Sequence, residues 1–340
     1  MTEVAVVVVN WNGGEWLDRC LRSVLAQQPP PAEILVVDNA STDASLSGLP
    51  AGVKVLNRPR NDGYAAALID GLAAVRAPAV LTLNPDVELQ AGCLAAAQAV
   101  LASDPQLGAV ALRVLSLHDP QRLDAIGIGL TSRFGPIDFG HGRRDAEVGS
   151  AEQDVLGPLG GAALWRREAV AAVGGPCPQY FLYFEDLDLA LRLARAGFRC
   201  RTAPAARALH AGGGTIGRGG ARNVFFMVRN HAACLLATLP AGVLRRRAAW
   251  LLLAPLRAAT LHARRGQLPA ALAGLLAAPL LLPGAWRRRA ALHRAVLALA
   301  NGDRAAAARL SAEAEVRLRS LFVDADEERR RSRAARTAAA

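Results

Sequence analysis

Short apolar runs that each end in a polar residue constrain the fold of this chain more than any other feature. The runs contain β-branched and aliphatic residues and almost no charge, which is typical of strands buried on both faces of a sheet. These strands are predicted at residues 4–9, 34–37, 53–56 and 79–83. Segments with helical spacing of apolar residues lie around them. These helices are predicted at residues 15–27, 64–75 and 94–102. Strands that alternate with helices in this way predict an α/β fold with a mostly parallel central sheet.

Polar side chains directly follow three of these strands. Asn10 follows the first, Asp38 the second, and Asn84 and Asp86 the fourth. Ligands of parallel α/β sheets bind at the carboxyl ends of the strands. We therefore expect these side chains to form one site, provided that the strands are neighbours.

The second half of the expected domain is less regular. Residues 105–157 contain many Gly, Arg and Asp residues and are predicted to form long loops with one or two short strands. A strand at 162–165 and helices at 166–173 and 185–196 follow, and Gly197 is the expected C-terminal cap of the last helix.

The basic character of the chain belongs to its last third. The net charge is +11, but residues 236–340 hold 19 Arg against 7 acidic residues. A polyanionic partner, if there is one, is expected to bind there, although the Arg and Ala content is also typical of a compositional bias of the source genome. This segment lacks the interleaved aromatic residues of a base-stacking surface, so nucleic acid is not the expected partner. The five cysteines have no C-x-x-C spacing, which suits a reducing cytosol and argues against a zinc site.

Residues 266–286 are uncharged and near the minimum length for a membrane span. Three prolines interrupt them, and arginines flank both ends, whereas a spanning helix carries positive charge mainly on one side. This pattern predicts helices that lie on an anionic membrane surface. We expect three regions: an α/β domain at 1–235, a helical membrane-associated region at 236–325 and a disordered tail at 326–340. The expected location is the cytoplasmic side, peripherally attached to the inner face of the cell membrane.

Asn84-Pro85-Asp86 at the end of a buried strand is the strongest candidate site. A carboxylate there can hold Mg²⁺ or Mn²⁺ against two phosphates, because these ions prefer oxygen ligands. The alternative is a turn that ends the strand, since all three residues favour turns. Asp38 can accept a hydrogen bond from the N3–H of uracil or thymine. Ser41 and Asp43, which follow it, are alternatively helix N-caps.

Three carboxylates lie within four residues at Glu185, Asp186 and Asp188. Their mutual repulsion is costly unless a cation or a proton-transfer role compensates for it, although a helix N-terminus also favours acidic residues. His210 precedes a run of glycines and can bind a metal or a phosphate, or be an ordinary histidine. Dinucleotide, P-loop and serine-hydrolase motifs are absent from the sequence.

Taken together, these motifs resemble glycosyltransferase family 2, which has the GT-A fold. The resemblance extends over residues 4–235 and is most like the rhamnosyltransferase-like branch. Besides the segments above, it includes the runs 61–66, 160–167 and 180–197.

The resemblance implies an inverting transferase that moves a sugar, with rhamnose as one candidate, to a lipid-linked or cell-envelope glycan. The implied donor is a dTDP-, UDP- or GDP-linked sugar. It implies Asp186, with Glu185 as substitute, as catalytic base, and Asp86 and His210 at the divalent cation. The implied donor-binding residues are Val9, Asn10, Asp38, Asn39, Asn61, Gly63 and Asn84.

Two other classes of function remain open from the residues. A sugar nucleotidyltransferase shares the sheet and the metal site, but it usually carries a basic Gly-rich loop after the first strand, and residues 10–14 contain no basic residue. A non-catalytic membrane-binding protein would explain the Arg-rich tail and leave the acidic clusters without a role.

Overall fold

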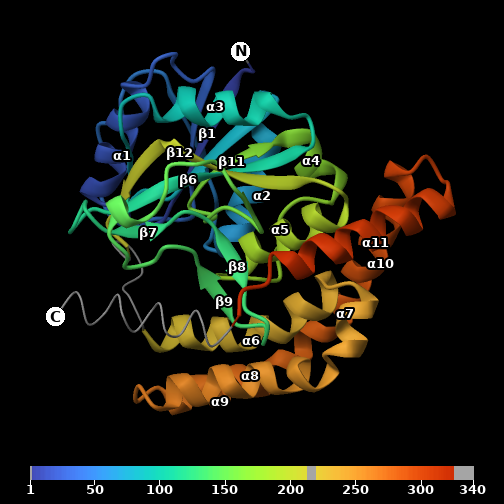
Figure 1. Ribbon diagram of the computed structural model, residues 1–340. Helices are drawn as coiled ribbons and strands as arrows, with labels where there is room; N and C mark the ends of the chain where they lie inside the picture. The colour runs from blue at the N-terminus through green and yellow to red at the C-terminus, as the bar shows by residue number, and fades with distance from the viewer. Residues whose placement is uncertain (1, 213–219, 325–340) are drawn as a thin grey trace.

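The computed structural model describes residues 2–212 and 220–324 of the chain. Strands and helices alternate over the first hundred residues, as the sequence predicts, and helices dominate after residue 220 (Figure 1). The strands are β1 (Val4–Asn10), β2 (Glu33–Asp38), β3 (Val53–Asn57), β4 (Ala79–Leu83), β5 (Val87–Leu89), β6 (Leu107–Ser116), β7 (Leu123–Ala125), β8 (Ile128–Leu130), β9 (Pro136–Asp138), β10 (Asp154–Val155), β11 (Ala162–Arg166) and β12 (Arg199–His210). The helices are α1 (Glu15–Leu25), α2 (Tyr64–Ala74), α3 (Cys93–Ser103), α4 (Arg167–Ala172), α5 (Glu185–Arg195), α6 (Ala221–Thr238), α7 (Ala241–Arg246), α8 (Ala248–Ala263), α9 (Leu268–Ala277), α10 (Leu282–Leu299) and α11 (Arg304–Ser320), with short 3₁₀ turns at Asp145–Glu147 and Ala278–Leu281.

One large sheet organises the α/β part, with strand order β10-β12-β6-β11-β4-β1-β2-β3. Strands β4, β1, β2 and β3 run parallel, whereas β11 runs antiparallel to both of its neighbours. The condition for a single site is met, because β1 pairs with both β2 and β4. Their carboxyl ends therefore meet at one edge, and the predicted α/β fold is confirmed.

Helices cover both faces of the sheet. Alternate residues of a strand point to opposite faces, so Val6 and Val8 of β1 pack with α1 and α3, and Val7 packs with α2. All three valines are fully buried, which explains why the strand contains no polar residue before Asn10. The last helix of the α/β part, α5, ends as predicted, with Gly197 in the left-handed region at a φ of 92°.

The prediction of long loops over residues 105–157 is wrong, because β6 is a ten-residue strand within the sheet. Arg113 interrupts its apolar pattern, yet the side chain is only 5% exposed. Its guanidinium donates to the carboxylate of Asp145 at 2.5 Å and to backbone carbonyls of Asp145, Val148 and Gly149. These partners compensate the buried charge, and they lie more than thirty residues away, where local pattern does not reveal them.

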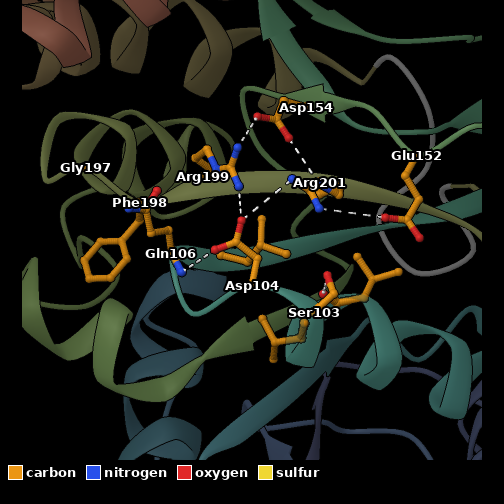
Figure 2. Close-up of polar contacts among 12 residues, drawn as sticks. Ser103, Asp104, Gln106, Glu152, Asp154, Gly197, Phe198, Arg199 and Arg201 are labelled. Atoms are coloured by element: carbon orange, nitrogen blue, oxygen red, sulfur yellow. Dashed lines mark hydrogen bonds and ion pairs between the residues drawn. The ribbon is translucent and has the colours of Figure 1, made fainter.

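An ionic network fastens the far end of the sheet (Figure 2). Asp104, which ends α3, accepts from Arg199 at the start of β12 and also lies 3.8 Å from Arg201. Both arginines reach Asp154 of β10, at 3.4 and 3.3 Å. These groups are partly exposed, so each pair contributes modestly, but together they fix the end of β12 opposite His210.

The C-terminal helices form a second layer beside the α/β part (Figure 1). Helix α6 packs against α8, α9 and α10, and α11 packs against α5. Buried residues of α10 and α11, such as Leu292 and Ala307, share a hydrophobic cluster with the sheet residue Trp165. Helix α6 runs through the expected boundary at residue 235, so the division into regions stays a prediction. The expected disordered tail at 326–340 lies outside the described residues.

Candidate active site

A cavity of about 430 Å³ lies at the carboxyl ends of β1, β2 and β4. The start of α5, the end of β12 and the start of α6 complete its wall. Nine of the predicted site residues line it: Val9, Asn39, Asn61, Gly63, Asn84, Asp86, Glu185, Asp186 and His210. Residues as far apart in the sequence as Val9 and His210 therefore meet in one cavity.

Asn10 and Asp38, also predicted to bind the donor, lie behind this wall. The Asn10 amide donates to the Asp38 carboxylate at 2.9 Å, and Ser41 Oγ donates to the same oxygen at 2.6 Å. The other Asp38 oxygen accepts one hydrogen bond from the described residues, which comes from the Ser41 backbone N–H at 3.0 Å. No helix begins between β2 and β3 in the described chain, so the interpretation of Ser41 and Asp43 as helix N-caps is wrong.

Asn39 ties the end of β2 to the loop before α2. Its amide donates to Asn61 Oδ1 at 2.9 Å and to the Gly63 carbonyl at 3.2 Å, and Arg58 donates to its oxygen at 2.7 Å. Gly63 has a φ of 96°, and a Cβ there would lie 2.2 Å from the Phe181 carbonyl oxygen. Only glycine allows this approach. The loop is therefore held against the segment that precedes α5.

Gly160 and Gly161 bring β11 against the metal-site candidate and the acidic cluster. A Cβ on Gly161 would lie 2.4 Å from the side-chain nitrogen of Asn84. The Gly160 N–H donates to Asp186 at 3.2 Å, and its carbonyl accepts from Tyr64 and Thr82 at 3.0 and 2.9 Å. Gly160 therefore connects Thr82 of the sheet to Asp186 of α5.

Asp86 and His210 meet because β5, directly after Asp86, pairs antiparallel with β12. His210 Nε2 lies 3.4 Å from Asp86 Oδ1, and Nδ1 lies 2.6 Å from the carboxylate of Asp124. Burial alone would lower the pKa of His210, but the two carboxylates outweigh burial and raise the pKa to about 9. The imidazole is therefore a cation that bridges two carboxylates in the ligand-free protein.

The donor set fits a divalent cation that shares its ligands with a substrate. Asp86 supplies a carboxylate, and His210 can supply Nε2 once it has lost its proton. No group of three side chains that could hold a metal ion occurs among residues 2–212 and 220–324. A cation held by two side chains would complete its coordination with phosphate oxygens and water, as Mg²⁺ and Mn²⁺ commonly do.

Glu185 and Asp186 begin α5 and both line the cavity. Burial and the charge of Asp186 raise the pKa of Glu185 to about 8, and burial also raises the pKa of Asp186. The Asp186 carboxylate accepts N–H bonds from Gly160 and Leu187, whereas Glu185 Oε2 has no hydrogen-bond partner within the described residues. Hydrogen bonds to a carboxylate favour its ionised form. We therefore assign the charge of this pair to Asp186 and the proton to Glu185 at neutral pH.

The turn before this pair is strained. Tyr183 and Phe184 have φ values of 64° and 74°, which are unfavourable for aromatic residues. Asn230 of α6 is fully buried and donates to the carbonyls of Leu182 and Tyr183, both at 2.9 Å. Asn230 thus holds the conformation that turns Glu185 and Asp186 toward the cavity.

Asp188, the third carboxylate of the cluster, has a structural environment. It is fully buried and forms an ion pair with Arg192 at 2.6 Å. Tyr180 donates to it at 3.3 Å, and Arg288 of α10 donates to Tyr180 at 2.7 Å. Arg289 caps carbonyls at the end of α6. Arg288 and Arg289, two of the arginines expected at a membrane surface, therefore bond to other parts of the protein instead.

The cavity also contains residues that sequence reasoning missed. Asp124 orients His210, and no motif marks it, because its position depends on β7 pairing with the end of β6. Trp11 stands in the turn after the first strand, so its position at the edge of the predicted site was a usable signal. The remaining charged residues that sequence reasoning missed are Asp138, His141 and Arg222.

Comparison with known proteins identifies the family of this chain. The model of the family described as glycosyl transferase family 2 matches residues 5–171, which include Asp38 and Asp86. The N-acetylglucosaminyl-diphospho-decaprenol L-rhamnosyltransferase of Mycobacterium tuberculosis is 30% identical over 247 residues. That alignment covers 64% of this chain and 79% of the relative, so the similarity includes most of the relative's length.

Solved structures show the same fold. GalNAc-T7 in complex with UDP, GalNAc and Mn²⁺ superposes with a TM-score of 0.57 and 17% identity, over 69% of this chain. The match covers 48% of that protein, so this chain spans about half of its length. The mannosyltransferase PcManGT of Pyrobaculum calidifontis, in complex with GDP-Man and Mn²⁺, gives a TM-score of 0.52 and 22% identity, and the match covers 87% of this chain and 86% of that protein. At these identities the likeness shows the GT-A fold alone.

Proposed function

This chain belongs to glycosyltransferase family 2 and is a glycosyltransferase, and from this premise we propose that it transfers L-rhamnose from a nucleoside-diphosphate donor to a lipid-linked glycan acceptor, with inversion. The sugar and the acceptor class rest on the similarity to the mycobacterial rhamnosyltransferase. The single observation that carries the proposal is the cavity, in which Asp86 and the Glu185–Asp186 pair face the same space. The family assignment removes the nucleotidyltransferase and the non-catalytic protein as alternatives.

Inversion needs one direct displacement, so the acceptor hydroxyl must lose its proton as it attacks. We assign this proton to Asp186, which is the ionised member of its pair. Asp86 and His210 would hold Mg²⁺ or Mn²⁺, which would neutralise the charge that develops on the leaving diphosphate. Val9, Asn39, Asn61, Gly63 and Asn84 would surround the nucleotide, and Asp38 would meet the base through its less occupied oxygen.

A donor screen tests the function. We expect dTDP-rhamnose to give nucleotide release that depends on a prenyl-diphosphate-linked N-acetylglucosamine acceptor. UDP- and GDP-linked sugars serve as matched donors. They carry the same diphosphate as dTDP-rhamnose and differ in the nucleoside and in the sugar that is transferred. Release from one of these donors instead would replace rhamnose in the proposal, and release from none of them with any lipid-linked acceptor would overturn it.

We further propose that the protein is attached peripherally to the inner, cytoplasmic face of a membrane through an apolar stripe on the C-terminal layer. Leu268, Leu272, Leu276 and Leu280 follow one another at intervals of four residues, and the last two are 82% and 80% exposed. This spacing places them along one side of α9 and the following 3₁₀ turn. Exposed arginines at 264, 265 and 287 lie near the two ends, where they can meet lipid phosphates.

The continuous helical run Leu268–Leu299 is long and apolar enough to cross a membrane, with a mean hydropathy of 1.8 over its best window. Length and composition alone are weak evidence for a span. Arg288 and Arg289 in this run bond to Tyr180 and to α6, which favours a helix that lies against the protein. We therefore propose attachment without a stable span.

Changing both Leu276 and Leu280 to glutamate is expected to release the protein from vesicles that contain anionic phospholipid. The two changes place charge on the most exposed leucines of the stripe, where little native packing is lost. Co-sedimentation measures the effect, and Val316→Glu, at an α11 position that is 67% exposed, is the matched control. Undiminished sedimentation of the double variant, or labelling of cysteines at 266 and 286 from opposite sides of a sealed membrane, would contradict peripheral attachment.

A further inference from the structure

Arg222 of α6 is the cavity residue whose chemistry the proposed function has not used. It is exposed and is the one arginine among the described residues that line the cavity. No carboxylate in the described part of the chain lies within 4.0 Å of its guanidinium. The described lining of the cavity contains five carboxylates, and the His210 cation is already paired with two of them, whereas the Arg222 guanidinium is paired with none.

Aromatic rings hold this guanidinium in place. Its central carbon lies 4.7 Å from the centroid of Phe181, 5.8 Å from that of Trp11 and 6.0 Å from that of Phe226. Phe181 in turn stacks on Phe226, with centroids 5.0 Å apart and planes at 10°. Rings attract the cation through their faces but do not neutralise it, so the N–H groups in the guanidinium plane stay available to a ligand.

The ligand class follows from the donor geometry. A fixed, planar fork of N–H groups matches the oxygens of a phosphate or carboxylate. The substrates of the proposed function carry diphosphates, and both the donor and a lipid-diphosphate acceptor have one. In the proposed function, the cation held by Asp86 and His210 would serve the diphosphate of the donor, which leaves that of the acceptor without a partner.

The position of Arg222 favours the acceptor. It stands on α6, the helix that separates the cavity from α8 and α9. A backbone contact brings Gly274 of α9 so close to α6 that a Cβ there would lie 2.7 Å from the Phe225 carbonyl oxygen. The exposed side of α9 carries the leucine stripe. The diphosphate of a lipid-linked acceptor lies between its lipid and its sugar, so an acceptor that reaches the cavity from this side would bring the diphosphate past α6, on which Arg222 stands.

We propose that Arg222, on its platform of Trp11, Phe181 and Phe226, binds the diphosphate of the lipid-linked acceptor. This proposal rests on the proposed function for the identity of the acceptor. The residue fixes the acceptor sugar relative to Asp186 and takes no part in proton transfer.

Binding of farnesyl diphosphate to the full-length protein tests this site without requiring turnover. Arg222→Ala is expected to weaken binding about tenfold or more, because it removes a charge-assisted pair of hydrogen bonds. Arg222→Lys keeps the charge but loses the fork, so it should restore only part of the affinity. Binding of dTDP and UDP should not change, which also shows that the cavity is intact.

Arg257→Ala is the matched control, because this exposed arginine also stacks on an aromatic ring, Trp250 at 5.2 Å, but lies outside the cavity. It should bind farnesyl diphosphate like the unchanged protein. Equal affinity of Arg222→Ala and the unchanged protein for farnesyl diphosphate would overturn the proposal, and so would a loss confined to dTDP and UDP, which assigns Arg222 to the donor. If no donor supports sugar transfer while farnesyl diphosphate binding still depends on Arg222, the site stands and the proposed function fails.

Discussion

Asp86→Ala is expected to lower sugar transfer by about 10³-fold, the largest effect of any single change in this protein. The reason is the loss of the carboxylate proposed to hold the divalent cation against the leaving diphosphate. Charge stabilisation of this kind contributes several kcal/mol, and each ~1.4 kcal/mol changes a rate tenfold. Steady-state transfer in the presence of Mg²⁺ or Mn²⁺ measures the effect.

Two further measurements separate this role from a structural one. Mn²⁺ affinity in the presence of dTDP should fall for Asp86→Ala and, to a smaller extent, for His210→Ala, because only one of the two ligands is anionic. Asp119→Ala is a suitable control, since this aspartate is half exposed and lies outside the cavity. Full turnover of the unchanged protein in excess chelator would rule out the metal role for Asp86.

Asp186→Asn is expected to keep donor and metal affinity while losing transfer by about 10²-fold or more. The amide is nearly the same size as the carboxylate, so the turn held by Asn230 and the contact with Gly160 should persist. The amide loses the ability to accept the proton of the acceptor hydroxyl, and its NH₂ group can no longer accept the N–H of Leu187. A fall in kcat with an unchanged Kd for dTDP is the signature of this role.

Glu185→Gln is the matched control for the base, because it changes the neighbouring carboxyl, which we assign as protonated at neutral pH. It should retain most of the transfer activity, since a neutral amide replaces a neutral acid. If Glu185→Gln abolishes transfer and Asp186→Asn does not, the two roles are exchanged. If neither change affects transfer, the base lies elsewhere in the cavity.

Much of the fold follows from local pattern. Residues 4–9 and 79–83 contain only apolar residues and one threonine, which is the composition of a strand buried on both faces. The buried strands β1 and β4 lie there. The helix starting at Glu185 has its predicted start, its broad apolar face and its terminal Gly197. Because ligands bind at the carboxyl ends of parallel strands, the same pattern predicts a site at Asn84 and Asp86, and both residues line the cavity.

The sequence by itself determined the helices and strands that depend on neighbouring residues along the chain. It also determined the strand ends at which the polar residues of the candidate site lie. Only the tertiary structure decided how distant charges are compensated. Arg113 lies inside β6 because Asp145 neutralises it, Asp124 orients His210 because β7 pairs beside it, and Asp188 is structural because Arg192 and Tyr180 surround it. A buried charge is tolerated only where a partner reaches it in space. That partner is set by strand pairing and helix packing, so periodicity does not identify which charged residues serve the site and which serve the fold.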